Sequence, residues 1–475
     1  MMLRSDFVAL LLLAVSAPAA HTAQLRPTSR LPDAPSAGHA FLASSEMGPV
    51  VGSPQGQASS AASTGVAPIL LTRQQAEQIA LTHNPGIRIG QLLAKAEHEV
   101  VRQSRSSLLP DLSGNLSAVQ AEEGSRISAG SLTASRLVQH AGMGIQLRQL
   151  ITDFGHTRNL VASAKLNEKA RLADAEASRA DIVLATDEVF YRTIEAEATL
   201  KVAKQTVAAR QTLVDQVSAL TSSKLKSDID LGFAEVNLSE AKLLQLDAEN
   251  NLDAAKAALD AVLGYDRQMD YKLMASPDDA APLPPDVGPL IASAIQNRPD
   301  LQSLQWSEQA ARKFSQAQHE QFLPTIGALG TVGKTPVGSS QYFNSDWYGA
   351  VGINMNVPVF NGFRYAAEAS EASLQAQAAA ERTRGLRDAV VRDVRTAWLN
   401  ARTAAQRVTV TGELLRQADL TLNLSQTRYH LGLSSIVELS QAQLQQTQAA
   451  ISEANARTQY GFAMAALRYQ TGSRP

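Results

Sequence analysis

The hexapeptide Ala80-Leu81-Thr82-His83-Asn84-Pro85 recurs later in the chain as Ala294-Ile295-Gln296-Asn297-Arg298-Pro299, 214 residues on (299 − 85). Further pairs keep this order: Leu109-Pro110 with Leu323-Pro324 at the same offset, then Gly144-Ile145 with Gly352-Ile353 and Gly264 with Gly472 at an offset of 208. Residues 68–264 therefore correspond to residues 282–472, with 265–281 as a linker. A repeat of this length indicates a duplicated domain with internal pseudo-two-fold symmetry.

Composition excludes several classes of protein. The chain has 475 residues, a formal net charge of −2 and no cysteine. The balanced charge gives no reason to expect a nucleic-acid partner. The absence of cysteine excludes disulfides, thiol chemistry and a lipid on an N-terminal cysteine, so the chain is not a lipoprotein.

The N-terminus has the pattern of a secretory signal peptide. Arg4 precedes an apolar run and then the small residues of Ala17-Pro18-Ala19-Ala20, so we expect a signal peptide over 1–23, with cleavage after Ala19, Ala20 or Ala23. Residues 24–67 are rich in Pro, Ala and Ser and lack periodicity, which predicts a leader that is disordered or drapes over the folded body. No later segment reaches the ~20 apolar residues of a membrane helix, so any membrane crossing must use strands.

Each copy ends in a long stretch without proline, rich in strong helix formers. This predicts two long helices per copy, at about 157–220 and 233–263, then 364–429 and 436–470. Apolar residues recur every three or four positions in the second helix, a stripe typical of coiled coils: Leu238, Ala241, Leu244, Ala248, Leu252, Ala255, Leu259 and Val262.

Short alternating segments precede each long helix. We predict strands at about 111–120 and 139–150, and at about 324–333 and 347–358. The last has one apolar face (Val351, Ile353, Met355, Val357) that we expect to meet the lipid of a bilayer. A half-buried soluble sheet is the alternative; it explains one such strand but not the attached signal peptide and long helices.

Four strands cannot span a bilayer alone. A lipid-exposed strand edge leaves backbone groups unpaired, and bacterial barrels begin at eight strands. We therefore expect three chains to share a 12-stranded β-barrel, continued by their helices as an α-helical coiled-coil tunnel. The predicted fold is mainly α with a small β part, built from duplicated β-β-α-α units.

These units resemble the TolC family of outer-membrane efflux and secretion ducts over about 68–472. The resemblance rests on three features present in both copies: the Asn84-Pro85 and Arg298-Pro299 helix openings, the strand-to-helix turns 150–155 and 358–362, and the helix tip 429–438 with its first-copy counterpart. It implies a homotrimer that is gated at its periplasmic tip and works with a periplasmic adaptor and an inner-membrane transporter, in efflux or type I secretion.

The resemblance also implies site residues at the tips. An acidic ring at the pore constriction corresponds to Glu438, with Gln441 one turn on and Asp230 at the matching place in the first copy. Such a ring would select cations. The alternative is that Glu438 and Asp230 are ordinary helix-start carboxylates, favoured by the helix dipole.

A gate latch and an adaptor contact follow from the same resemblance. Tyr429 matches a tyrosine that bonds the first-copy acid, here Asp230, in the closed form, while Ser434 replaces a basic latch residue. The residues that match the adaptor-contact tips are Gly432 and Leu433 in one copy and Lys224, Leu225 and Lys226 in the other.

No arrangement of residues indicates an enzyme, a cofactor or a metal site. None of the eight histidines pairs with another at metal-ligand spacing within a helix, and no serine has a nucleophile-elbow context. A periplasmic coiled-coil scaffold, or an adaptor-like protein without a pore, is the alternative to a duct. It leaves the amphipathic strands unexplained. The cargo is left open, since a passive duct leaves selection to its pump.

Overall fold

The computed structural model describes residues 69–119, 126–127, 135–136, 140–267, 269, 271–274, 282–337 and 347–472. All of them lie in one unit, residues 66–475. The expected signal peptide and leader lie outside the described residues. So does most of the segment between residues 119 and 140.

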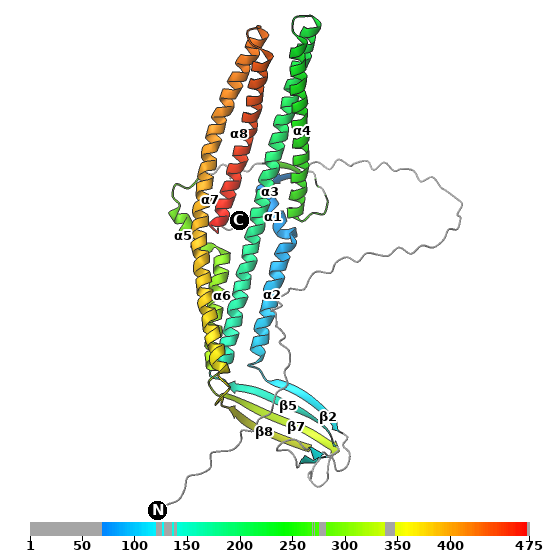
Figure 1. Ribbon diagram of the computed structural model, residues 1–475. Helices are drawn as coiled ribbons and strands as arrows, with labels where there is room; N and C mark the ends of the chain where they lie inside the picture. Colours follow the sequence, from blue (N-terminus) through cyan, green and yellow to red (C-terminus); the bar gives the residue numbers. More distant parts are fainter. Residues whose placement is uncertain are drawn as a thin grey trace, which may run out of the picture. The chain divides into compact units, whose positions relative to one another are not determined.

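The two copies contain the same elements in the same order (Figure 1). The first has α1 Arg73–His83, α2 Pro85–Ser106, β2 Asp111–Val119, β5 His140–Thr152, α3 His156–Ser222 and α4 Asp228–Leu263. The second has α5 Gly288–Asn297, α6 Pro299–Glu320, β7 Thr325–Val337, β8 Trp347–Asn356, α7 Arg364–His430 and α8 Ile436–Gln470. Four short strands complete the described elements: β1 Ile69–Thr72, β3 Arg126–Ile127, β4 Ser135–Arg136 and β6 Tyr271–Met274.

Several boundaries differ from those that the sequence predicted. Helix α4 begins at Asp228 rather than 233, because Ser227 caps it and Gly232 lies inside the helix instead of ending it. Strand β8 ends at Asn356, two residues short of 358, so Val357 lies beyond the strand. Pro358 follows, and proline has no backbone N–H to donate to a sheet.

The sequence indicated helix openings at Asn84-Pro85 and Arg298-Pro299, but no ranges were predicted for the two helices at the start of each copy. In α2 and α6 the proline of each Asn-Pro or Arg-Pro motif occupies the first helical turn, where a missing N–H costs nothing. Asn84 caps α2 by accepting from the amide of Gly86 at 2.9 Å. The repeating unit is therefore two helices, two strands and two long helices.

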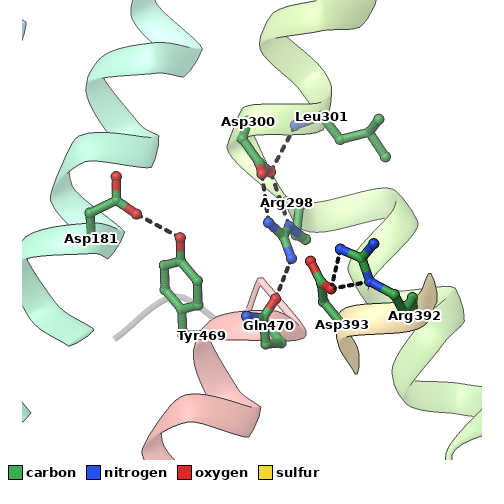
Figure 2. A network of polar contacts seen from close by, with 8 residues as sticks. All are labelled: Asp181, Arg298, Asp300, Leu301, Arg392, Asp393, Tyr469 and Gln470. Atoms are coloured by element: carbon green, nitrogen blue, oxygen red, sulfur yellow. Dashed lines mark hydrogen bonds and ion pairs between the residues drawn. The ribbon is translucent and has the colours of Figure 1, made fainter. Parts of the chain in front are cut away.

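The residue before each proline also closes its own copy of the repeat. The side-chain amide of Asn84 donates to the Val262 carbonyl at 3.1 Å, in the last turn of α4. At the matching place in the second copy, Arg298 donates to Gln470 in the last turn of α8 and pairs with Asp300 (Figure 2). Val262 and Gln470 are 208 residues apart. In each copy a polar side chain at the start of the second helix therefore bonds to the last turn of the final helix.

Glycine is required where these ends meet. Gly264 and Gly472 follow α4 and α8 with φ of +82° and +68°, a left-handed conformation that suits glycine. A Cβ on Gly472 would lie 2.8 Å from the backbone nitrogen of Arg298. The repeated glycines therefore permit both the turn and the close approach.

The stretch 265–281, expected as a linker, supplies a strand. Within it β6 pairs in parallel with β1, with Leu71 opposite Leu273. Beneath this pair lies a buried apolar cluster that includes Leu71, Phe190, Leu259 and Leu263. The linker thus anchors the start of the first copy to α3 and α4.

The main sheet has the strand order β2-β5-β7-β8, with all neighbours antiparallel. Its register aligns apolar side chains in rows; Leu112, Leu147, Gly330 and Val351 form one row across all four strands. The resulting apolar face contains Leu112, Leu116, Met143, Ile145, Leu147, Ala328, Val332, Val351, Ile353 and Met355. The opposite face carries Ser113, Asn115, Gln146, Thr331, Asn354 and Asn356.

The apolar face is open to solvent in the single chain: Val351 is 92% and Ile353 75% exposed. Strands β2 and β8 are the two edges of the sheet, and each is paired on one side only within the described residues. The sheet therefore carries both an uncovered apolar face and two open edges.

The long helices form two hairpins, α3–α4 and α7–α8, which lie side by side and meet through α3 and α8 (Figure 1). The buried face of α4 includes Leu238, Ala241, Ala248, Ala255 and Leu259, as the heptad pattern predicted. Near the turns, Leu213 and Val217 of α3 pack with Ile436 and Leu439 of α8. Among the described residues, no helix is both long and apolar enough to cross a membrane.

Candidate functional site

The candidate site is the pair of turns that close the two hairpins. Each helix end is closed by a backbone bond five residues back: Leu225 to the Leu220 carbonyl and Leu433 to the Arg428 carbonyl, both at 2.8 Å. The left-handed residue of the second turn is Gly432, at φ +72°, whereas the first turn has Lys224 at +60°. A lysine here carries backbone strain that glycine avoids, so the first tip is the less relaxed of the two.

Serine caps start both return helices. Ser227 accepts from the Ile229 amide at 3.2 Å, and Ser435 accepts from the Glu438 amide at 3.3 Å. Asp230 and Glu438 lie in the first turns of these helices, where the dipole favours a negative charge. The dipole therefore accounts for the presence of an acid at each position, whatever further role it has.

Tyr429 is the centre of the apolar core at the tips. It is 3% exposed and packs with Leu213, Val217, Ile436 and Leu439, so one side chain joins the two hairpins. The ammonium of Lys226 lies 4.3 Å from the ring centroid, a cation–π contact between the two turns. Apolar packing and this cation–π contact join the tips, and a little farther along the hairpins Asn237 of α4 donates to the Ser440 hydroxyl of α8 at 2.9 Å.

The expected hydrogen bond between Tyr429 and Asp230 is not formed. The Tyr429 hydroxyl is buried and has no hydrogen-bond partner among the described residues. Burial raises the pKa of Tyr429, and the negative charge of Asp230 raises it further, so the two groups are close enough to interact electrostatically. Apolar packing fixes the ring, and its hydroxyl is left without an acceptor. The Ser434 hydroxyl is likewise buried without a partner.

Glu438 has a basic neighbour that the sequence did not suggest. The Arg428 Nε lies 3.7 Å from a Glu438 carboxylate oxygen, and the Arg428 guanidinium also donates to the Leu433 carbonyl at 3.4 Å. Glu438 is thus part of an exposed ion pair rather than an isolated acid. The sequence feature that could have indicated this pair is Arg428 in the last turn of α7, where the helix dipole favours a cation. Gln441 is exposed on α8 one turn beyond Glu438.

The residues expected to meet an adaptor differ in exposure. Leu225 and Leu433 are exposed at equivalent places in the two turns, and Lys224 and Gly432 are also exposed. Lys226 is half-buried because its side chain lies over Tyr429.

A buried polar layer crosses the two hairpins farther from the tips. The Arg210 guanidinium donates to the Gln443 side chain, and Thr206 lies 3.4 Å from Thr447. Burial lowers the pKa of Arg210, partly opposed by the charge of Glu240. Polar residues in a helical seam fix its register. The described residues contain no cluster of His, Cys, Asp or Glu arranged to hold a metal.

Comparison with known proteins identifies this arrangement. Residues 77–265 and 290–473 match the family described as outer membrane efflux protein, so both copies are covered. The chain belongs to this family. Its members are outer-membrane efflux channels and not enzymes, which confirms the outer-membrane location and the absence of an enzymatic role predicted from the sequence.

Individual members of the outer membrane efflux family support the match. The outer membrane efflux protein BepC of Brucella suis biovar 1 (strain 1330) is 23% identical over 367 residues, 76% of each chain. The outer membrane protein TolC of Salmonella enteritidis is 22% identical over 412 residues, 84% of this chain and 81% of that one. A crystal structure of CusC aligns with a TM-score of 0.76 at 17% identity, over 85% of this chain and 92% of that one. These matches confirm the resemblance to TolC and the predicted mainly helical fold.

Proposed function

We propose that this protein is the exit duct of a tripartite efflux or secretion system, formed by three copies of the chain. The observation that carries the proposal is the four-stranded sheet with one apolar face and two unpaired edges, in a chain of the outer membrane efflux family. In a bilayer each open edge would leave backbone groups without partners, which is prohibitively costly. Pairing β8 of one chain with β2 of the next, around three chains, removes every edge and gives a 12-stranded barrel.

The long helices support the same assembly. Helix α4 has a second apolar stripe that its own chain leaves exposed: Ile229, Phe233, Val236, Leu243 and Leu246. Helix α7 exposes another: Val410, Leu414, Leu420 and Leu424. Both stripes have the helical spacing of a packing face. Contacts between neighbouring chains along α4 and α7 would cover these stripes and continue the barrel as a helical tunnel in the periplasm.

A coiled-coil scaffold without a pore fits these features less well. A scaffold also needs exposed helical stripes, but it has no use for a sheet whose large apolar residues lie mostly on one uncovered face. Large exposed apolar surfaces mark contact with lipid or protein. Outer-membrane lipid is the partner that fits a face of this length and pattern.

The assembly is tested by the mass of the protein extracted from outer membranes in mild detergent. We expect native mass spectrometry to give three times the mass of the mature chain. A monomer at all protein concentrations would overturn the proposed duct, since one chain cannot close the barrel.

We further propose that the helix tips form the gate and receive a periplasmic adaptor, which couples the duct to an inner-membrane transporter. Leu225 and Leu433, exposed at equivalent points of the two turns, are the proposed adaptor contacts, beside Gly432, Lys224 and Lys226. Glu438 and Gln441 of α8, with Asp230 in the first turn of α4, would line the constriction. The Arg428–Glu438 pair makes this constriction less acidic than a ring of free carboxylates.

Substitution of Glu438 and substitution of Arg428 should shift ion selectivity in opposite directions. In planar bilayers we expect Glu438→Gln to lower the ratio of cation to anion permeability severalfold, because Arg428 is left uncompensated. Arg428→Gln should raise the ratio, because it frees the carboxylate. Glu453→Gln is a matched control, since Glu453 also pairs with an arginine on α8 but lies farther from the tip. Equal selectivity of all three variants and the parent would place the constriction elsewhere.

A further inference from the structure

A buried charged cluster joins the first helix of the protein to the long helix α3. Arg73 and Glu77 of α1 and Asp187 of α3 are 5%, 6% and 4% exposed. Arg73 pairs with Glu77, and its guanidinium lies 3.6 Å from an Asp187 carboxylate oxygen. Two carboxyl groups therefore share one nearby arginine in an environment that excludes water.

The second copy of the repeat performs the same packing without charges. Val287 and Ile291 occupy the positions of Arg73 and Glu77, at an offset of 214 (287 − 73 and 291 − 77), and pack with Val390 and Val394. The position that matches Asp187 on α7 is Arg395, which is exposed. Replacing a buried ion cluster with apolar residues is often neutral or stabilising. We call the contact of α1 with α3, and of α5 with α7, the joint of each copy. The fold does not need charges at this joint, so their presence in the first copy requires another reason.

The charges around Asp187 determine which form of the cluster is stable. Burial raises the pKa of Asp187 to about 8, and the charge and hydrogen bonding of Glu77 act in the same direction, against Arg73 and Arg468. Two neighbouring buried carboxyls cannot both ionise easily, so the charge of Glu77 favours a proton on Asp187. With one proton in the cluster, the remaining negative charge lies against Arg73, and Arg468 acts on Asp187 as a second cation.

This cluster, at the contact of α1 with α3, also lies close to α8, α4 and β6. Arg468 of α8 acts on Asp187, and the next residue, Tyr469, donates to Asp181 of α3 at 2.6 Å (Figure 2). Gln470 then accepts from Arg298. From α4 and β6, Asp260 and Tyr271 bond to each other at 2.8 Å. The same last turn of α8 that faces the cluster thus anchors the helix that carries Glu438 at its other end.

We propose that Glu77 and Asp187 share a proton and act as a pH-sensitive tether, which holds α1 against α3 when protonated and releases it when the proton is lost. Loss of the proton leaves two negative charges against Arg73 in a buried site. The second copy, packed by valine and isoleucine, has no such response. The joint would therefore loosen on one side of each chain as the surroundings become alkaline.

The direction follows from the raised pKa. A carboxyl whose pKa is higher in the closed form than in the open form stabilises the closed form fully at low pH. That stabilisation is lost as the pH rises from about 4, the ordinary carboxyl range, towards 8, and no further loss is expected above it. Opening of α1 should thus increase across pH 5.5 to 8 and then level off.

The absence of cysteine in the chain permits a direct test on the assembled protein. Ala80 of α1 and Ala294 of α5 occupy equivalent positions, and both are 0% exposed. In Ala80→Cys and Ala294→Cys, labelling by a maleimide reports exposure of the two joints, and the ratio of their rates cancels the pH dependence of the thiol itself. We expect this ratio to rise more than tenfold between pH 5.5 and 8.

Asp187→Asn and Glu77→Gln, each in both cysteine backgrounds, test the origin of the change. Either variant removes one ionisable carboxyl, so the ratio should become flat with pH. Asp181→Asn, which removes a nearby carboxylate outside the buried cluster, should keep the rise. A flat ratio in the parent, or a rise that persists in Glu77→Gln, overturns the proposal; the Glu77 variant decides the matter if Asp187→Asn fails to assemble.

Discussion

Ile353→Arg is expected to destabilise the assembled protein in the membrane by about 2–4 kcal/mol if the residue lies near the bilayer midplane. Ile353 is 75% exposed on the apolar face of β8, in the row that contains Ala328. An arginine there would have to lie in hydrocarbon, with no acidic partner in that row. The amount of folded trimer recovered from outer membranes, and its resistance to denaturant, measure the effect.

The adjacent residue is the matched control. Asn354 lies on the opposite face of the same strand, beside Gly327, where the proposed barrel has its aqueous lumen. Asn354→Arg should therefore allow assembly and change conductance instead. If Asn354→Arg impairs assembly more than Ile353→Arg, the two faces of the sheet have been assigned the wrong way round.

The elements with a strong periodic signal could be predicted from the sequence. Alternation with period two gave the faces of β8, and the heptad stripe gave the buried side of α4, because each pattern is the direct consequence of a local geometry. The short helices could not be predicted in the same way. In α2 the Pro85-Gly86 pair has the composition of a turn, and only the cap by Asn84 and packing against α3 make it the start of a helix.

The polar contacts of the site were harder to predict than its position. Offsets between the copies aligned Asp230 with Glu438, but the approach of Arg428 to Glu438 depends on how tightly the turn closes. The joint of Glu77 with Asp187 spans 110 residues (187 − 77), and nothing in either local sequence signals it. Similarity to a family suggested a bond to Tyr429 that the packing of this chain does not form.

The copies of the repeat differ most at their joints. Where the first copy uses Arg73, Glu77 and a lysine at the tip, the second uses Val287, Ile291 and Gly432. Each second-copy choice relieves a cost, either of buried charge or of backbone strain. The first copy thus concentrates the features that favour movement, at both ends of its hairpin.

Tyr429 gives the largest effect expected at the tips. Tyr429→Ala removes the side chain that packs with Leu213, Val217, Ile436 and Leu439, and we expect it to destabilise the tip by about 3–5 kcal/mol, the usual cost of deleting a buried aromatic ring. The tunnel should then be open for most of the time in planar-bilayer recordings, and the protein should unfold at a lower temperature.

Tyr429→Phe separates the ring from its hydroxyl. Because the hydroxyl is buried without a partner, its removal should leave stability unchanged or raise it by about 1 kcal/mol, and the open fraction should not increase. Tyr469→Phe is the matched control: its hydroxyl donates to Asp181 at 2.6 Å, so the same substitution should cost about 1.5–3 kcal/mol. If Tyr429→Phe instead opens the duct as Tyr429→Ala does, the hydroxyl must find an acceptor in the assembled trimer, with Asp230 as the nearest charged candidate. Packing alone would then not be what holds the gate.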